Sequence, residues 1–260
     1  MKLLVKLGGT LLDEAASRDR LAAEIAEVVG EGHQVVVVHG GGKQLTRFLA
    51  EKGLQSNFIR GFRVTTPETL DGVIKVLAGQ VNTELVAALV RAGARAVGLT
   101  GADDGLVGAV QLEADLGAVG RVEQVRAGLL DLLTANGYVP VVACLAGGRE
   151  GVVYNVNADQ FAAALAQGYG AERLMFLTDV DGVLEGDGGR IAELTTGEAL
   201  ELIEQGVAKG GMEAKLRACA GAVEGGVGEV RIVAGARAGA VREAVRRAGA
   251  GTAIRPGASR

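Results

Sequence analysis

The sequence of 260 residues is poor in the residues that build disulfide scaffolds, proline-rich linkers and nucleic-acid surfaces. It contains two cysteines, three prolines and no tryptophan, and aromatic residues make up only 3%. Because Cys144 and Cys219 lie in apolar segments, we expect packed, reduced thiols and no disulfide scaffold. The net charge of -4 comes without a basic stripe, which argues against a nucleic-acid partner and is typical of proteins that handle small molecules.

Several common site motifs are also missing from the sequence. No Gly-x-x-x-x-Gly-Lys-Ser/Thr run is present, which excludes a P-loop enzyme, and no Gly-x-Gly-x-x-Gly run supports dinucleotide binding. No Cys and His cluster has the spacing of metal ligands, so no metal held by the protein is expected. No signal peptide precedes the strand expected from Lys2, and no apolar run looks long enough to span a bilayer, so we expect a cytoplasmic protein without a membrane partner.

Glycine, by contrast, is abundant: 42 of the 260 residues are glycine, roughly twice the usual share of about 7%. The most informative glycines lie in residues 34–43, QVVVVHGGGK, where four valines predict a buried parallel strand. Gly40, Gly41 and Gly42 then bring bare backbone to the carboxyl end of the sheet, just before a helix. Open α/β sheets bind ligands at this end, and free N–H groups at a helix start favour an anion. The alternative is a tight turn that needs only positive φ angles.

The remaining sequence alternates apolar strands with helical periods, which predicts a mainly parallel α/β sheet with right-handed crossovers. Helices should start after Asn157 and Thr195, because a Gln or Glu follows each of these caps three residues later. Pro67 is expected to open a long helix that ends near residue 90, and the last helix is expected over residues 238–247. The expected core strands and hairpins cover residues 2–7, 34–39, 58–66, 95–99, 107–125, 138–143, 173–178, 229–233 and 252–255.

Lys6 is the first anomaly, because it is the only charge inside an apolar strand and leads directly to Gly8 and Gly9. Lysine is almost never fully buried without a partner. Either the end of the strand is wet, or Lys6 faces an anion. Two glycine turns after neighbouring strands, with a lysine beside one of them, favour a phosphate site.

Four further side chains each allow a functional and a structural interpretation. Arg63 could grip a carboxylate with two parallel hydrogen bonds, or could be a surface arginine. Asn155 and Asp159 flank a helix start, where they could simply serve the cap, but Asp159 could also hold lysine ammonium groups. Lys215 lies at the edge of an apolar helical stripe, so it either extends to water or reaches into a cleft.

Five segments, in this order, resemble the amino acid kinase family, in particular its N-acetylglutamate kinases. They cover nearly the whole chain and are Lys6-Leu7-Gly8-Gly9, His39-Gly40-Gly41-Gly42, Gly61-Phe62-Arg63-Val64-Thr65, Asn155-Val156-Asn157-Ala158-Asp159 and Gly210-Gly211-Met212 with Lys215. Phe62 departs from the leucine that is usual in the family. The resemblance implies a three-layer αβα sandwich, with an acyl-amino-acid lobe at residues 1–155 and a nucleotide lobe at residues 156–260.

The resemblance also implies roles for individual residues. Lys6 and Lys215 would stabilise the transition state, and Asp159 would orient both lysines. The acyl amino acid would be bound by Gly41, Gly42, Arg63 at its α-carboxylate and Asn155 at its amide end. ATP would be held by Gly8, Gly9, Thr178, Asp179, Val180, Asp181, Gly182, Val183, Leu184, Lys209, Gly210 and Gly211.

The implied activity is transfer of the ATP γ-phosphoryl group to the γ-carboxylate of N-acetyl-L-glutamate, with Mg²⁺ held mainly by the phosphates, in a homodimer. Arginine-inhibited relatives have an extra N-terminal helix, and the strand expected from Lys2 argues against such feedback here. Two alternatives keep the fold: a kinase for carrier-linked aminoadipate or glutamate, and an amino-acid sensor without activity. Residues 176–184 also resemble haloacid-dehalogenase phosphatases, but Asp187 is the last aspartate, and that family needs further aspartates downstream.

Overall fold

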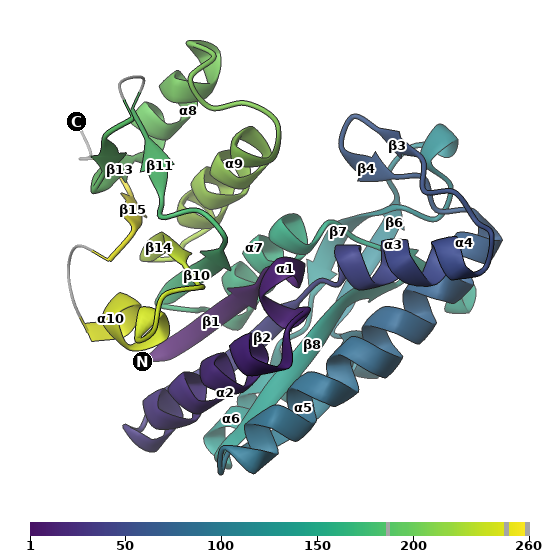
Figure 1. The fold of residues 1–260 in the computed structure, drawn as a ribbon, viewed down its shortest axis with the longest axis horizontal. Coiled ribbons are helices and arrows are strands. Elements are labelled where there is room, and N and C mark those ends of the chain that lie inside the picture. Colours follow the sequence, from purple (N-terminus) through teal and green to yellow (C-terminus); the bar gives the residue numbers. More distant parts are fainter. Residues whose placement is uncertain (186–187, 247–249, 258–260) are drawn as a thin grey trace.

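A single, mainly parallel sheet runs through the molecule, whose computed structural model describes residues 1–185, 188–246 and 250–257 (Figure 1). In this part of the chain the sheet has 11 strands, in the order β13-β15-β14-β10-β1-β2-β8-β6-β7, with β5 and β9 also paired to β8. Its central strands are mostly apolar because helices cover both faces. These strands are β1 (Lys2–Leu7), β2 (Gln34–His39), β8 (Tyr138–Gly147), β10 (Arg173–Thr178) and β14 (Glu229–Ala234).

The outer strands bring in the antiparallel pairs of the sheet, which are β6 with β7, β8 with β9, and β14 with β15. Figure 1 shows the N-terminal and C-terminal elements on opposite sides of the neighbouring strands β1 and β10. The outer strands are β5 (Arg95–Gly101), β6 (Val107–Gln111), β7 (Gly120–Val125), β9 (Val153–Asn155), β13 (Glu193–Thr195) and β15 (Thr252–Arg255). Two small hairpins lie outside the sheet and consist of β3 (Phe58–Ile59) with β4 (Phe62–Arg63), and β11 (Val183–Leu184) with β12 (Arg190–Ile191).

Helices form a layer on each face of the sheet, which confirms the expected three-layer αβα architecture (Figure 1). One layer contains α2 (Ala15–Gly30), α3 (Gly42–Glu51), the continuous helix α4 (Pro67–Val73), η1 (Ile74–Val81) and α5 (Asn82–Arg91), and α10 (Ala240–Arg246). The other layer contains α6 (Gly128–Ala135), α7 (Ala158–Tyr169), α9 (Gly211–Glu224) and α8 (Thr196–Glu204), which packs on α9. The short helix α1 (Gly9–Leu12) directly follows β1 and contacts α2 and α3.

The predicted helix starts are confirmed by their capping hydrogen bonds. The Asn157 side chain accepts from the backbone N–H groups of the first turn of α7, and Thr195 with Glu198 forms a complete capping box at α8. Thr66 caps the helix that Pro67 opens. The last helix begins at Ala240, two residues later than expected, and Arg247 lies outside the described residues.

The expectation that residues 95–99 form a core strand is wrong. Within the described residues, β5 pairs only with β8 and therefore lies at an edge of the sheet, where Arg95 and Gly98 are exposed. One face of β5 is covered by α5. An edge position needs the same apolar residues on its covered face as a central position, so the sequence pattern could not separate the two.

The helix from Pro67 to Arg91 corrects the expectation that no apolar segment is long enough to span a bilayer. Its 25 residues include a window with a mean hydropathy of 1.5, of which 44% is buried, so its length and composition would allow it to cross a membrane. Val73, Leu77, Leu85 and Leu89 of this helix are buried in the hydrophobic core that the sheet shares. The core helix of a soluble protein packs in the same way.

Candidate active site

Two glycine turns lie side by side at the carboxyl edge of the sheet. β1 and β2 are parallel neighbours and end level with each other, at Leu7 and His39, so Gly8-Gly9 and Gly40-Gly41-Gly42 leave the sheet together. None of these five glycines has a left-handed φ, so the interpretation as a turn that needs positive φ is wrong. At Gly9 and Gly41 the reason for glycine is space, because a Cβ atom on Gly9 would lie 3.1 Å from the Gly42 nitrogen and one on Gly41 would lie 3.2 Å from the Leu77 side chain.

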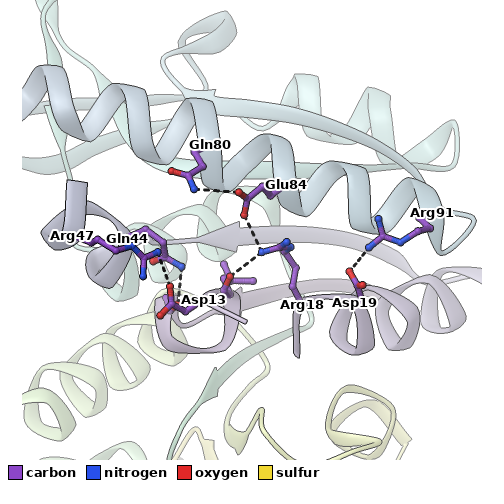
Figure 2. Close-up of polar contacts among 10 residues, drawn as sticks. Asp13, Arg18, Asp19, Gln44, Arg47, Gln80, Glu84 and Arg91 are labelled. Carbon is purple, nitrogen blue, oxygen red and sulfur yellow. Dashed lines mark hydrogen bonds and ion pairs between the residues drawn. The ribbon is translucent and has the colours of Figure 1, made fainter. Parts of the chain in front are cut away.

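Polar contacts hold the first glycine turn against α3 and the long helix (Figure 2). Gln44 of α3 is 6% exposed and donates from Nε2 to the Gly9 carbonyl oxygen at 3.2 Å. Arg47 pairs with Asp13 just after α1, at 3.0 Å. Arg18 of α2 donates to Glu84 of α5 at 2.9 Å, and to the last carbonyl of α1 at 3.1 Å. The turn after β1 is therefore anchored to the elements that carry the turn after β2.

His39, at the end of β2, supports the second glycine turn through hydrogen bonds. Its Nδ1 donates to the Gly40 carbonyl oxygen at 2.8 Å, and its Nε2 accepts from Asn82 at 2.9 Å. Complete burial lowers the pKa of His39 to about 4, although the hydrogen bond to Gly40 acts in the opposite direction. The ring is therefore neutral near pH 7 and adds no positive charge, and its hydrogen bond to Gly40 helps to shape the glycine turn.

Lys6 and Lys215 meet on one carboxylate, that of Asp159 in the first turn of α7. Lys6 Nζ lies 2.7 Å from Asp159 Oδ1, and Lys215 Nζ donates to Asp159 Oδ2 at 2.7 Å. Both lysines are only 8% exposed, so Lys6 does not mark a wet strand end and Lys215 does not extend to water. Lys215 Nζ also lies 5.2 Å from the centre of the Phe176 ring.

The electrostatics of this cluster favour an additional anion. Burial alone would raise the pKa of Asp159, but the two lysines outweigh it and hold that pKa below its usual value, so the carboxylate is ionised. Two ammonium groups and one carboxylate leave a net charge of +1 in a largely buried place. Buried charges need partners, so this excess positive charge favours an anion beside the cluster.

A cavity of about 180 Å³ lies between the second glycine turn and the start of α7, the helix that carries Asp159. Gly41, Gly42, Arg63 and Asn155 line it, so the structure brings together all four residues predicted to bind the acyl amino acid. The rest of its wall is largely apolar and includes Leu45, Leu77, Val119, Cys144 and Val156. Ala158, the chain neighbour of Asp159, also lines the cavity.

Arg63 is half-buried in the wall of this cavity, so the interpretation as a free surface arginine is wrong. It lies on β4, and its burial lowers the pKa of the guanidinium. Its Nη2 donates to Thr46 Oγ1 at 2.8 Å and to the Gly42 carbonyl oxygen at 3.2 Å, while Nη1 donates to Ser56 Oγ. Asn155 lies on β9, where its Nδ2 donates to Thr65 Oγ1 at 3.1 Å.

The residues predicted to bind ATP fall into the turn after β1, a partly exposed group over residues 178–184 and an exposed group over residues 209–211. Gly8 donates its N–H to Leu177 at 3.0 Å, which puts the turn after β1 beside the end of β10. Thr178 ends β10, the turn over residues 179–182 follows it, and Val183 and Leu184 form β11. Lys209, Gly210 and Gly211 are exposed at the start of α9, the helix that carries Lys215 to Asp159. Their binding of ATP stays a prediction.

Several residues of the site were not predicted from the sequence. Gln44 and Thr46 look like ordinary polar positions of an amphipathic helix, Ser56 lies in a loop, and Asn82 lies inside a helical period. Each gains its role from a partner that is distant in the chain or on another element. An asparagine or glutamine on the apolar face of a predicted helix is the one clue that could have been used, and it applies to Asn82.

Comparisons with known proteins agree with the geometry. The model of the amino acid kinase family matches residues 1–234. The acetylglutamate kinase of Solibacter usitatus (strain Ellin6076) is 59% identical over 242 residues, which cover 93% of this chain and 94% of the relative. The acetylglutamate kinase of Koribacter versatilis (strain Ellin345) is 42% identical over 243 residues, which cover 93% of each chain.

Solved structures show the same relationship at the level of the fold. An N-acetylglutamate synthase from Neisseria gonorrhoeae, complexed with coenzyme A and N-acetyl-glutamate, is similar with a TM-score of 0.88 at 28% identity. The similarity covers 99% of this chain but 60% of the synthase chain. A carbamate kinase from Giardia, at 18% identity and a TM-score of 0.71, shares the fold over 98% of both chains. By its family match, its relatives and its fold, this chain belongs to the amino acid kinase family.

Proposed function

We propose that this chain transfers the γ-phosphoryl group of ATP to the γ-carboxylate of N-acetyl-L-glutamate, giving N-acetylglutamyl 5-phosphate in arginine biosynthesis. The observation that carries the proposal is the pair of buried ammonium groups on Asp159, beside two glycine turns and a cavity with an arginine. The names of the relatives support it, since proteins 59% and 42% identical over nearly the whole chain are acetylglutamate kinases.

The cavity suits a small acyl amino acid. Arg63 supplies a positive charge for the α-carboxylate, and Asn155 supplies an amide for the acyl-amide end. The apolar side chains of the wall suit a short acyl group. The γ-carboxylate then extends past the glycine turns toward the lysine cluster.

The chemistry needs charge neutralisation more than a base. A γ-carboxylate is already ionised at neutral pH, so its attack on phosphorus requires no proton transfer, and the neutral His39 is not needed as a base. Phosphoryl transfer depends mainly on positioning and on stabilising the charge that develops on the transferred group. Lys6 and Lys215 would supply that stabilisation, and free N–H groups of the two glycine turns would complete it.

A divalent metal would be held mainly by the phosphates of ATP and not by side chains of the protein. In residues 1–185, 188–246 and 250–257 no group of three His, Cys, Asp or Glu side chains could hold a metal ion. Asp159 has a lysine on each oxygen, so it is not available as a ligand. Mg²⁺ bound to ATP would neutralise phosphate charge. Asp179 and Asp181, in the turn after β10, have exposed carboxylates that would accept hydrogen bonds from its water molecules.

A coupled assay of ADP release tests the proposed reaction. With ATP, turnover is expected on N-acetylglutamate and not on glutamate or N-acetylaspartate, because the cavity recognises the acyl group and the length of the side chain. Binding of ATP without turnover of any acid would instead indicate an amino-acid sensor. Turnover only of a carrier-linked acid, or phosphate release without nucleotide, would also contradict the proposal.

We also propose that residues 1–155 bind the acyl amino acid and residues 156–260 bind the nucleotide. Arg63 and the cavity belong mainly to the first segment, whereas the turn after β10 and the start of α9 belong to the second. In the same assay, Arg63→Ala is expected to raise the KM for N-acetylglutamate about 100-fold, since a charged contact is lost, with little change in the KM for ATP. Equal effects on both values would contradict this division.

We propose that the protein works as a homodimer in the cytoplasm. In the described part of the chain β5 has one neighbour in the sheet, so its outer edge is open, and Ile74 and Val90 of the covering helix are 40% and 54% exposed. Both cysteines are free and buried, which suits a reducing compartment. Light scattering should report a dimer, and the monomer mass of 26.4 kDa would contradict it. Cell fractionation would test the compartment.

A further inference from the structure

Arg63 lies at the boundary between two cavities, so its side chain needs a device that keeps it in place. The cavity of about 180 Å³ and an adjoining, more open cavity of about 600 Å³ share Gly42, Phe58 and Arg63. The guanidinium carbon lies 4.7 Å from the centre of the Phe58 ring, which leaves its edges accessible to polar partners. An unrestrained arginine at such a place would lose considerable rotamer freedom on binding a ligand.

The hydrogen bonds of Arg63 leave no complete pair of adjacent donors free. Both edges of a guanidinium that can meet a carboxylate with two parallel bonds include Nη2. Here Nη2 donates to Thr46 Oγ1 at 2.8 Å and to the Gly42 carbonyl oxygen at 3.2 Å. A carboxylate that binds through two donors must therefore replace one of these partners, and the more distant Gly42 oxygen is the weaker of the two.

Thr46 lowers the free-energy cost of this replacement. Its hydroxyl donates to the same Gly42 oxygen at 2.8 Å, so that oxygen keeps a hydrogen bond when Arg63 leaves it. Because the single hydroxyl proton is directed at Gly42, a lone pair of Thr46 Oγ1 is left to accept from Nη2. Ser56 accepts from Nη1 and restrains the other end of the group.

We propose that Thr46 is a positioning residue for Arg63. Thr46 anchors one N–H of Arg63 Nη2, and it keeps the Gly42 oxygen hydrogen-bonded when the carboxylate of the substrate replaces that oxygen as a partner of Nη2. The inference rests on the proposed function, in which Arg63 binds the α-carboxylate of the acyl amino acid. Thr46 itself does not contact the reacting atoms. Its effect should therefore appear in the binding of one substrate and pass entirely through Arg63.

Steady-state kinetics of T46V, T46S, R63A and the double variant T46V/R63A test this inference, with T83V, at an exposed threonine of α5, as a matched control. T46V is expected to raise the KM for N-acetylglutamate about tenfold, with less than about a twofold change in the KM for ATP. T46S keeps the hydroxyl and should restore the wild-type KM. T46V should add nothing in the R63A background, and T83V should behave as the wild type.

Two results would overturn the inference. One is a T46V protein with wild-type KM values; the other is a T46V effect that persists in the R63A background, since Thr46 would then act through α3 alone. A wild-type protein without turnover of N-acetylglutamate would instead overturn the proposed function, and this inference with it. Melting curves of every variant separate loss of fold from loss of binding.

Discussion

Lys6→Ala and Lys215→Ala are each expected to lower kcat by about two to three orders of magnitude while the protein stays folded. Each substitution would remove an ammonium group that contacts the transferring phosphoryl group, where negative charge is spread over the oxygens. The KM values should change less than kcat, because the contact matters most in the transition state. Initial rates at saturating ATP and N-acetylglutamate measure the effect.

The fold should tolerate either substitution, because the remaining lysine still pairs with Asp159 at 2.7 Å and the cluster becomes neutral. Lys75→Ala is a suitable control, since Lys75 is exposed and its partner is another exposed residue, Asp71. Kinetics of the control should match the wild type. Near wild-type turnover in Lys6→Ala or Lys215→Ala would remove that lysine from the proposed mechanism.

Asp159→Asn is expected to affect both catalysis and stability, because it leaves two ammonium groups buried together without a carboxylate. Removing one partner of a buried ion pair typically costs about 3–5 kcal/mol of unfolding free energy. For a chain of this size the melting temperature would fall by about 10 °C. The kcat should also fall by about two orders of magnitude, since the lysines lose the group that orients them.

The stability loss has a predictable pH dependence. The pKa of Asp159 is lower in the folded protein than in the unfolded chain, so its contribution is complete above the unfolded value of about 3.9. As the pH falls through the folded pKa, Asp159 is protonated in both states and the contribution disappears. The difference between wild type and Asp159→Asn should therefore be full at neutral pH and shrink in acid.

A matched control is Asp131→Asn, which breaks the exposed ion pair with Lys2. Exposed pairs contribute about 0–1 kcal/mol, so the melting temperature should change little. Urea unfolding at several pH values, with both variants and the wild type, gives the comparison. An Asp159→Asn protein as stable as Asp131→Asn would show that the lysine cluster does not depend on its carboxylate.

The pattern of the sequence was sufficient for the fold class and for most of the longer elements, but not for short ones such as α1 and β13. The four valines before Gly40 predict a buried parallel strand, and β2 is one, because a strand covered on both faces must be mostly apolar. The helix starts at Asn157 and Thr195 were also readable, since capping depends on residues only a few positions apart. The edge position of β5 could not be predicted, because it depends on whether a second strand pairs with β5, which its own sequence does not show.

For the site, the sequence by itself determined which residues were unusual: a lysine inside an apolar strand, three glycines in a row, and a lysine on the margin of an apolar stripe. It could not decide between burial with a partner and exposure to water, because each option fits the same local pattern. Tertiary structure decided this by bringing β1, α7 and α9 together so that Asp159 meets both lysines. The same holds for Gly9, where the turn after β2 leaves little room for a side chain, and for Thr46, whose hydroxyl matters only because the β3–β4 hairpin brings Arg63 to it.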